Sequence, residues 1–282
     1  MGKKLVTVEK DHGPLLVSMD LHGNGEDFGR LCELFLDSHG RGEDPIWVSV
    51  GDWVHGPSLE GRLRARSKGG ESLYDYPDAS AAMMRELFGL MDAHPGRILS
   101  LCGNHEHAHI GGRRTCKFHD DEAAYLEAQL TPDEVMELRR RFADWPIAIR
   151  LPSAGVVITH GAMAGAIAGP HELEQLRYDG PNAGAAGELF QAAMTHYGFS
   201  DGGDVDVLTR LRDPGGPPYH LIVHGHDRDE EGHSPTGERA LLVCTSFGAR
   251  RDRKAYLWLD LARQYRQLGD LREGHEIRFL WR

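Results

Sequence analysis

Residues 98–106 read ILSLCGNHE, a compact apolar run that ends in Gly103-Asn104-His105-Glu106. The run is short, shows no helical periodicity and stops at glycine, which predicts a buried β-strand. Its polar end places an amide, an imidazole and a carboxylate directly after the strand. Open α/β sheets bind their ligands at strand ends, where glycine lets the backbone approach a site closely. This stretch therefore predicts both an α/β fold and the edge of the sheet at which a site lies.

Four further apolar runs end in the same kinds of residue. Taken one at a time, an Asp or a His at a strand end is more often a turn former or a hydrogen-bonded structural residue. Five such ends in chain order, each at the same place relative to its strand, favour one shared site. The four are Leu15–Met19 before Asp20 and His22, Ile46–Val50 before Asp52, Val156–Thr159 before His160, and Leu221–Val223 before His224 and His226.

Segments with helical periodicity alternate with these strands, which predicts a layered α/β sandwich. Helices are expected at 28–36, 79–91 and 121–130 and from Thr131-Pro132 through Phe142, and further strands at 241–244 and 255–259. Residues 164–187 and an insert at 56–78 show no periodicity, so we expect surface loops there, with the insert over the cleft. No repeat or low-complexity linker divides the chain, which predicts a single domain over residues 1–282.

The balance of charge limits the partners that this chain can have. It has 32 Lys and Arg against 43 Asp and Glu among 282 residues, a net charge of −11 with His neutral. This balance argues against a protein that coats nucleic acid and against a membrane-surface binder, because both need a cationic face. Four widely spaced Cys, no secretory segment and no apolar run long enough to cross a bilayer predict a reduced, cytoplasmic protein.

The polar strand ends combine into a ligand set for two divalent cations. Two cations roughly 3.5–4 Å apart need a bridging anion, and a carboxylate such as Asp52 can bridge where an imidazole cannot. Asp20 and His22 can reach a first cation if their loop turns both inward. A second cation would be held by Asn104, His160 and His226. This mixture of nitrogen and oxygen suits Mn, Fe, Zn or Co better than Ca or Mg alone, and water between such cations becomes hydroxide that attacks phosphorus in line.

Three of these segments carry a resemblance to a known family. MDLHGN (19–24), GDWVHG (51–56) and GNHE (103–106) resemble the blocks GDxHG, GDxVDRG and GNHE of the calcineurin-like metallophosphoesterase superfamily, most closely its phosphoprotein phosphatase branch. The resemblance spans about residues 15 to 260, and the segment from Lys117 to Glu122 is similar to the family's GFYDE. It implies a four-layer α-β-β-α sandwich and two divalent metal ions, Mn first among them.

The resemblance also implies a role for each matching residue. Asp52 becomes the bridging ligand at the centre of the catalytic site, and His105 the general acid that protonates the leaving oxygen. Glu106, or another acceptor, would poise His105. His224 falls where the family has an Arg, so we expect it to be a pocket residue. The implied metal ligands are Asp20 and His22 for the first ion, Asp52 for both, and Asn104, His160 and His226 for the second.

The second block departs from the family pattern at two positions. His55 stands where the family has the Asp that orients the general acid, and Gly56 where it has the Arg that grips the phosphate. We expect His55 in the cleft, where it either bonds to His105 or only fills the turn. Another cationic side chain must then neutralise the phosphate. Any single Arg is more often a solvated surface charge than a phosphate ligand. The expected cations are Arg113 and Arg114, Arg250 and Arg251, or the insert's Arg62, Arg64 and Arg66.

The sequence leaves three functions open. The first is a metal-dependent phosphomonoesterase of the phosphoprotein phosphatase kind, acting on phosphoserine or phosphothreonine, in which hydroxide between the metals attacks and His105 donates the proton. The second is a hydrolase of dinucleoside polyphosphates, like diadenosine tetraphosphatase, or of small phosphodiesters, which the missing Arg and the Arg-rich insert favour. The third is a metal-binding scaffold without turnover. The partner expected in the first two cases is a phosphorylated protein, nucleotide or small ester.

Overall fold

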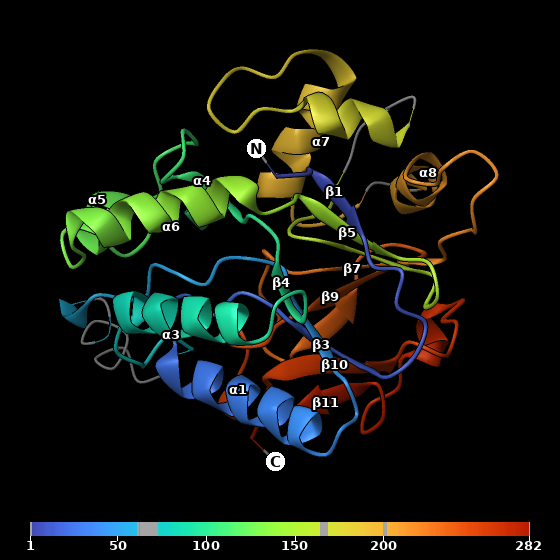
Figure 1. Ribbon diagram of the computed structural model, residues 1–282, viewed down its shortest axis with the longest axis horizontal. Coiled ribbons are helices and arrows are strands. Elements are labelled where there is room, and N and C mark those ends of the chain that lie inside the picture. The colour runs from blue at the N-terminus through green and yellow to red at the C-terminus, as the bar shows by residue number, and fades with distance from the viewer. Residues whose placement is uncertain (1, 61, 63–72, 164–168, 200–201, 282) are drawn as a thin grey trace.

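Two β-sheets form the centre of the computed structural model, which describes residues 2–60, 62, 73–163, 169–199 and 202–281 (Figure 1). One sheet has the strand order β1-β5-β6-β7-β9-β8, and the other has the order β11-β10-β2-β3-β4. The strands of the first are β1 (Leu5–Thr7), β5 (Ala148–Leu151), β6 (Val156–Thr159), β7 (Leu221–His224), β9 (Ala240–Val243) and β8 (His233–Pro235). Those of the second are β11 (Ile277–Phe279), β10 (Ala255–Asp260), β2 (Pro14–Ser18), β3 (Ile46–Ser49) and β4 (Ile98–Ser100).

Alternating side chains along the strands build two separate cores. In β2, Leu15 and Val17 join an apolar cluster shared with Ile158 and Val223 of the other sheet, while Leu16 between them joins a cluster with Phe28 of a helix. This is the period of two that a strand covered on both faces requires. The first cluster lies between the sheets and the second lies under the helices, so the layers are α-β-β-α. The predicted four-layer sandwich is confirmed.

Helices cover the outer face of each sheet (Figure 1). The helix α1 begins where Asn24 accepts a hydrogen bond from the Asp27 backbone, and α6 begins at the predicted Thr131-Pro132 signal, where Thr131 and Glu134 form a capping box. One face carries α1 (Gly25–Gly40) and α3 (Ser80–Ala93). The other side carries α4 (Asn104–His107), α5 (Glu122–Glu127), α6 (Pro132–Asp144), α7 (Gly184–Thr195) and α8 (Gly203–Arg210).

The strand directions decide where the polar strand ends meet. In one sheet β2, β3 and β4 run parallel, and in the other β6, β7 and β9 run parallel. The carboxyl ends of parallel neighbours lie at the same edge of their sheet. The loops that follow β2, β3 and β4 therefore lie side by side, and so do those that follow β6 and β7.

The expected loops are only partly loops. Residues 164–187 include a 3₁₀ helix at Pro170–Gln175 and the start of α7 at Gly184, so the expectation of an irregular segment was wrong there. The Ala- and Gly-rich start of α7 hides its amphipathic pattern, although Leu189 and Phe190 are buried. Of the 56–78 insert, Arg64 and Arg66 lie outside the described residues. No helix in the described ranges is long and apolar enough to cross a membrane.

Candidate metal centre and active site

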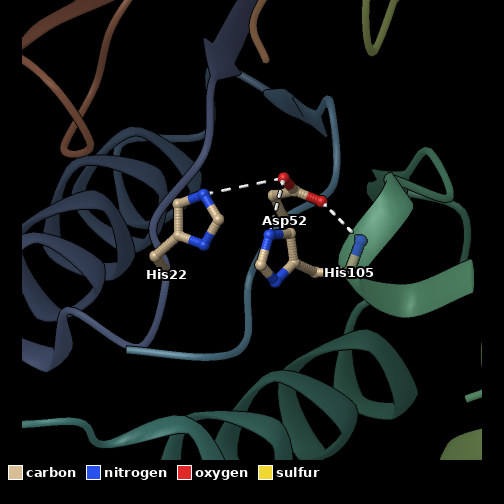
Figure 2. A group of neighbouring side chains, drawn as sticks. All are labelled: His22, Asp52 and His105. Atoms are coloured by element: carbon tan, nitrogen blue, oxygen red, sulfur yellow. Dashed lines mark hydrogen bonds and ion pairs between the residues drawn. The ribbon is translucent and has the colours of Figure 1, made fainter. Parts of the chain in front are cut away.

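Asp52 occupies the centre of the converging loops. Its backbone N–H donates to Glu106 Oε2 over 2.7 Å, and its Oδ1 accepts the backbone N–H of His105 over 3.0 Å. Its other oxygen, Oδ2, lies 3.6 Å from His22 Nε2, 3.6 Å from His160 Nε2 and 4.0 Å from His105 Nε2. Figure 2 shows the rings of His22 and His105 turned toward this carboxylate. One buried oxygen thus faces imidazoles from three separate segments, of which His105 belongs to α4.

His160 connects Asp52 to the second group of predicted ligands. Its Nδ1 lies 3.0 Å from the Val50 carbonyl, which can only accept, so Nδ1 carries the proton and Nε2 carries a lone pair. This Nε2 atom lies 3.1 Å from Asn104 Oδ1 and 3.0 Å from His226 Nδ1. Nitrogen and oxygen atoms with lone pairs therefore face one another here, and few N–H groups are present to donate hydrogen bonds to them.

Asp20 and His22 also keep atoms free for a ligand. Asp20 Oδ2 accepts the backbone N–H of His226 over 2.5 Å, and Asp20 Oδ1 lies 3.6 Å from His160 Nδ1. Among the described residues, neither Asp20 Oδ1 nor His22 Nδ1 has a hydrogen-bond partner, although both atoms are buried. Buried polar atoms without partners cost free energy that a ligand would recover.

The backbone is strained at the same residues. His22, Asp52, His55 and His226 have φ values of 44°, 51°, 70° and 67°, in the left-handed region that residues with a Cβ rarely adopt. Each such residue costs on the order of 1–3 kcal/mol. Strain of this kind persists where the surrounding structure requires a particular side-chain direction, and here all four side chains belong to the polar cluster.

Burial shifts the pKa values of the cluster in the directions that a cation would reverse. It raises the pKa of Asp52 to about 7 and, with the nearby Asp52 charge, raises the pKa of Asp20 well above its usual range. Burial lowers the pKa of His160 to about 3 and that of His226 to about 2. Two adjacent carboxylates with neutral imidazoles form an electron-rich pocket that favours added positive charge. A divalent cation supplies that charge, so these donors fit a metal site.

The predicted ligands therefore lie together. His22, Asp52 and His105 form one group of atoms close enough to hold an ion, and Asp52, His160 and His226 form another. Asp52 belongs to both groups, which is the position that the sequence predicts for a bridging ligand. Asn104 lies beside the second group, through its contact with His160, and Asp20 lies beside His160 and His226.

Glu106 does not poise His105 in the structure. Its carboxylate accepts the backbone N–H groups of Asp52, Trp53 and Gly103 over 2.7, 2.9 and 3.0 Å. It therefore fixes the loop that carries Asp52, and burial followed by the Asp52 charge raises its pKa to about 8. The acceptors nearest to the His105 ring are instead His55 and Glu122.

His55 was expected in the cleft, but it is buried behind His105, to which it is hydrogen-bonded, and it is not among the described residues that line the cleft. The two Nδ1 atoms are 2.8 Å apart, which realises the first of the two expectations for His55. Glu122 Oε2 lies 3.6 Å from His105 Nδ1. Burial lowers the pKa values of both His55 and His105 well below the usual range, and it raises that of Glu122.

A cleft of about 920 Å³ opens above the cluster. It is lined by His22, Asp52, His105 and His226 from the cluster, and by Arg113, Arg114, Lys117 and Arg228 among its cationic residues. Arg114 is paired with Asp121 over 3.1 Å. Lys117 is exposed as a whole residue, but its ammonium lies 3.4 Å from the centre of the Phe247 ring. That ring packs 4.4 Å from the ring of His22, so Lys117 places a positive charge beside the cluster.

Three other predicted substrate-binding residues lie elsewhere. Arg250 pairs with Glu231 over 2.7 Å, and Arg251 pairs with Glu26 while it packs on the Trp281 ring. His224 is buried, with Nε2 2.7 Å from Thr236 Oγ1. None of the three is among the described residues that line the cleft, because each is held by a partner outside it.

Sequence reasoning missed three residues of the site. Lys117 and Glu122 belong to the segment that resembles the family's GFYDE, but nothing in that resemblance predicted that Lys117 lines the cleft or that buried Glu122 faces His105. His109 contacts His55, with the Nε2 atoms 2.9 Å apart. Helical spacing offered no signal for it, because α4 ends at His107 and His109 lies in the turn that follows.

Comparison with known proteins places the fold. No protein-family model matches the chain, and no curated protein matches it. Among solved structures, the chain is similar to a protein serine/threonine phosphatase from Saccharomyces cerevisiae with similarity to human phosphatase PP5. The TM-score is 0.53 and the identity is 16%, over 91% of this chain and 76% of that one.

Two further solved structures are similar over most of the chain. A cold-active protein tyrosine phosphatase has a TM-score of 0.50 and 15% identity, over 92% of this chain and 76% of that one. A putative diadenosine tetraphosphatase has a TM-score of 0.48 and 18% identity, over 91% of this chain and 94% of that one. At these identities the likenesses to the serine/threonine and tyrosine phosphatases support the fold.

Proposed function

We propose that this chain, which has the calcineurin-like metallophosphoesterase fold, is a metal-dependent phosphatase that hydrolyses phosphomonoesters. One observation carries the proposal: buried donors from the loops after β2, β3, β4, β6 and β7 converge on Asp52, whose carboxylate is shared by two groups of ligand atoms. A ligand set of this kind is the one that two cations with a bridging carboxylate require.

The residues of the site have two roles in this proposal, metal binding and proton transfer. Asp20, His22 and Asp52 would hold one cation, and Asp52, Asn104, His160 and His226 the other. Bound cations supply a water of lowered pKa and neutralise charge on the phosphate. The set of nitrogen and oxygen donors favours Mn over Ca or Mg. His105, whose Nε2 faces Asp52 Oδ2, is placed to give a proton to the leaving oxygen.

Lys117 takes the place of the phosphate-gripping Arg that is absent at Gly56. Its ammonium lies over Phe247 at the wall of the cleft, and among the described residues it forms no ion pair within 4.0 Å. Its charge is therefore available to a phosphate oxygen. Two other cations of the cleft already have partners: Arg114 pairs with Asp121, and the Arg228 side chain is hydrogen-bonded to Tyr74. Preorganised positive charge of this kind stabilises the charge that develops on a phosphoryl group.

The test is phosphate release by metal-free and Mn²⁺-loaded protein from p-nitrophenyl phosphate and from phosphoserine and phosphothreonine peptides. We expect metal-dependent release from the monoesters, and loss of release in Asp52→Asn. A protein that holds two ions and releases no phosphate from any ester would contradict the proposal and would favour a metal-binding scaffold.

One observation favours a second candidate, the hydrolysis of dinucleoside polyphosphates. The Tyr197 ring lines the cleft, is 59% exposed and stacks on His226 with an angle of 7° between the rings. An exposed ring at the mouth of the cleft offers a stacking face for a nucleobase. Chromatography of the products from diadenosine tetraphosphate separates the candidates: ADP supports the second, while phosphate from peptides alone supports the first.

A further inference from the structure

A buried chain of three imidazoles lies behind His105. His105 Nδ1 lies 2.8 Å from His55 Nδ1, His55 Nε2 lies 2.9 Å from His109 Nε2, and His109 Nδ1 lies 2.8 Å from Glu127 Oε1. The three histidines are buried, and Glu127 also accepts two hydrogen bonds from Arg139, at 2.9 and 2.6 Å. The chain thus runs from the cleft to an ion pair between Glu127 of α5 and Arg139 of α6.

The carboxylate at the end of the chain sets the direction of every hydrogen bond in it. The hydrogen bonds from His109 and from Arg139, against the opposing effect of burial, lower the pKa of Glu127 to about 2, so it is ionised and only accepts. His109 therefore donates from Nδ1 and accepts at Nε2. His55 then donates from Nε2 and accepts at Nδ1. His105 is left to donate from Nδ1, which turns the lone pair of its Nε2 toward Asp52.

A second carboxylate faces the same two rings. Glu122 Oε1 accepts the Phe118 backbone N–H over 2.7 Å, while Oε2 is buried and has no hydrogen-bond partner among the described residues. This oxygen lies 3.6 Å from His105 Nδ1 and 3.9 Å from His55 Nδ1. A buried oxygen beside two imidazoles is placed to balance positive charge on either ring.

We propose that His55, His109, Glu122 and Glu127 are positioning residues that hold the His105 ring with its Nδ1–H inward and its Nε2 toward the cleft. The inference rests on the proposed function, since it assigns a role in that reaction. There, water adds its oxygen to phosphorus with one of its protons and gives the other proton to solvent, which restores the proton of His105 Nε2 after each turnover. The ester P–O bond breaks with its electron pair on the leaving oxygen, and that oxygen takes the proton of His105 Nε2. The ring left behind is protonated at Nδ1 alone, which is the tautomer that the chain specifies. Glu122 balances the charge that the ring carries before the transfer.

The first test reads the tautomers directly and needs no turnover. Long-range ¹H–¹⁵N correlation spectra of the full chain, labelled in histidine and loaded with diamagnetic Zn²⁺, distinguish a proton on Nδ1 from one on Nε2. His→Gln variants assign the signals. We expect His105 and His109 protonated at Nδ1 and His55 at Nε2. A neutral His105 protonated at Nε2 would overturn the inference.

The second test uses the leaving group. Phenyl phosphate needs a proton on its leaving oxygen, whereas 2,4-dinitrophenyl phosphate leaves without one. In Glu122→Gln we expect kcat for phenyl phosphate to fall about 10- to 100-fold, part of the 10²–10⁴ that proton transfer contributes, and kcat for the dinitrophenyl ester to change less than about threefold. Glu33→Gln, on the exposed face of α1, is the matched control and should change neither.

A pair of substitutions at His55 tests whether the hydrogen-bond acceptor that His55 offers to His105 is what matters. Its φ of 70° suits both Asn and Gly, so neither variant adds backbone strain. Asn keeps an acceptor oxygen near the position of Nδ1, and we expect His55→Asn to retain activity on phenyl phosphate within about fivefold. Gly removes the acceptor, and we expect the same selective loss in His55→Gly as in Glu122→Gln. Losses of equal size on both esters in His55→Gly and in Glu122→Gln would contradict the inference.

The two tests separate this inference from the proposed function. If the wild-type protein hydrolyses neither ester with any metal, the proposed function fails, and the spectra still decide the tautomers. If it hydrolyses both esters but the variants show no dependence on the leaving group, the function stands and the positioning role fails.

Discussion

Lys117→Met provides the sharpest test of how the cleft binds phosphate. The ammonium of Lys117 lies 3.4 Å from the Phe247 ring centre at the wall of the cleft. A hydrogen bond to a charged group contributes about 1.5–3 kcal/mol. Because Lys117 as a residue is exposed, we take the lower part of this range, about 1.5–2 kcal/mol. At 1.36 kcal/mol for each factor of ten, kcat/KM should fall about 10- to 30-fold.

The assay is hydrolysis of p-nitrophenyl phosphate with Mn²⁺, together with inhibition by inorganic phosphate. We expect Lys117→Met to lower kcat/KM and to raise the inhibition constant of phosphate. Arg114→Gln is the matched control, because Arg114 also lines the cleft but pairs with Asp121 at the surface. A surface pair contributes about 0–1 kcal/mol, so this variant should stay within about fivefold of the wild type. The reasoning is refuted if Lys117→Met keeps its phosphate affinity while Arg114→Gln loses it.

The pH dependence gives Lys117 a second signature. Burial of the ammonium lowers the pKa of Lys117 to about 8, against the opposing effects of Asp52, Asp20 and Glu122. A lysine loses its charge as the pH rises through its pKa, so phosphate binding should weaken above about pH 8. Lys117→Arg keeps its charge over this range, and its alkaline limb should move to higher pH. An unchanged limb in this variant would assign the limb to another group.

Three further outcomes follow from the site and its supports. Asp52→Asn should abolish the rise in melting temperature that Mn²⁺ gives the wild type, measured by differential scanning fluorimetry, because it removes the carboxylate shared by both groups of ligand atoms. Gly103→Ala should weaken Mn²⁺ binding at least about tenfold in a calorimetric titration, because the added Cβ would overlap Asp52 Oδ1. Gly89→Ala is the control, because an added Cβ there meets nothing within 4 Å; it should bind Mn²⁺ normally and gain up to about 1 kcal/mol of stability. The lowered pKa of Glu127 means that its stabilising effect is present above about pH 4.5 and is lost as the pH falls toward 2, so urea unfolding of Glu127→Gln should depend less on pH across that window.

The fold and the centre of the site could be predicted because their signals are local. Each strand is a short apolar run, each ligand follows its strand directly, and parallel neighbours bring these ends to one edge. Thr131 and Pro132 mark the start of α6 within the sequence itself. The left-handed backbone of Asp52 and His55 was not predicted, because it follows from how the loops pack rather than from their residues.

The surroundings of the site depend on contacts between distant segments, which no local pattern encodes. Arg251 was expected to bind phosphate, but Glu26, 225 residues earlier in the chain, holds it at the surface. Glu122, the first residue of α5, faces His105 across a gap of 17 residues in the chain, with Oε2 3.6 Å from His105 Nδ1. Lys117 reaches the cleft through the position of Phe247, which follows β9. In each case the residue type indicated which kind of partner the side chain could have, but only the tertiary structure decided which partner it has.

The Mn²⁺ dependence of catalysis tests the central claim most directly. The measurement is the rate of p-nitrophenol release from p-nitrophenyl phosphate by chelator-treated protein as Mn²⁺ is added in known ratio to the chain. The account predicts no release without metal and a rate that saturates when two Mn²⁺ are bound to each chain. Full activity in the metal-free protein, or no activity with two ions bound, would contradict it.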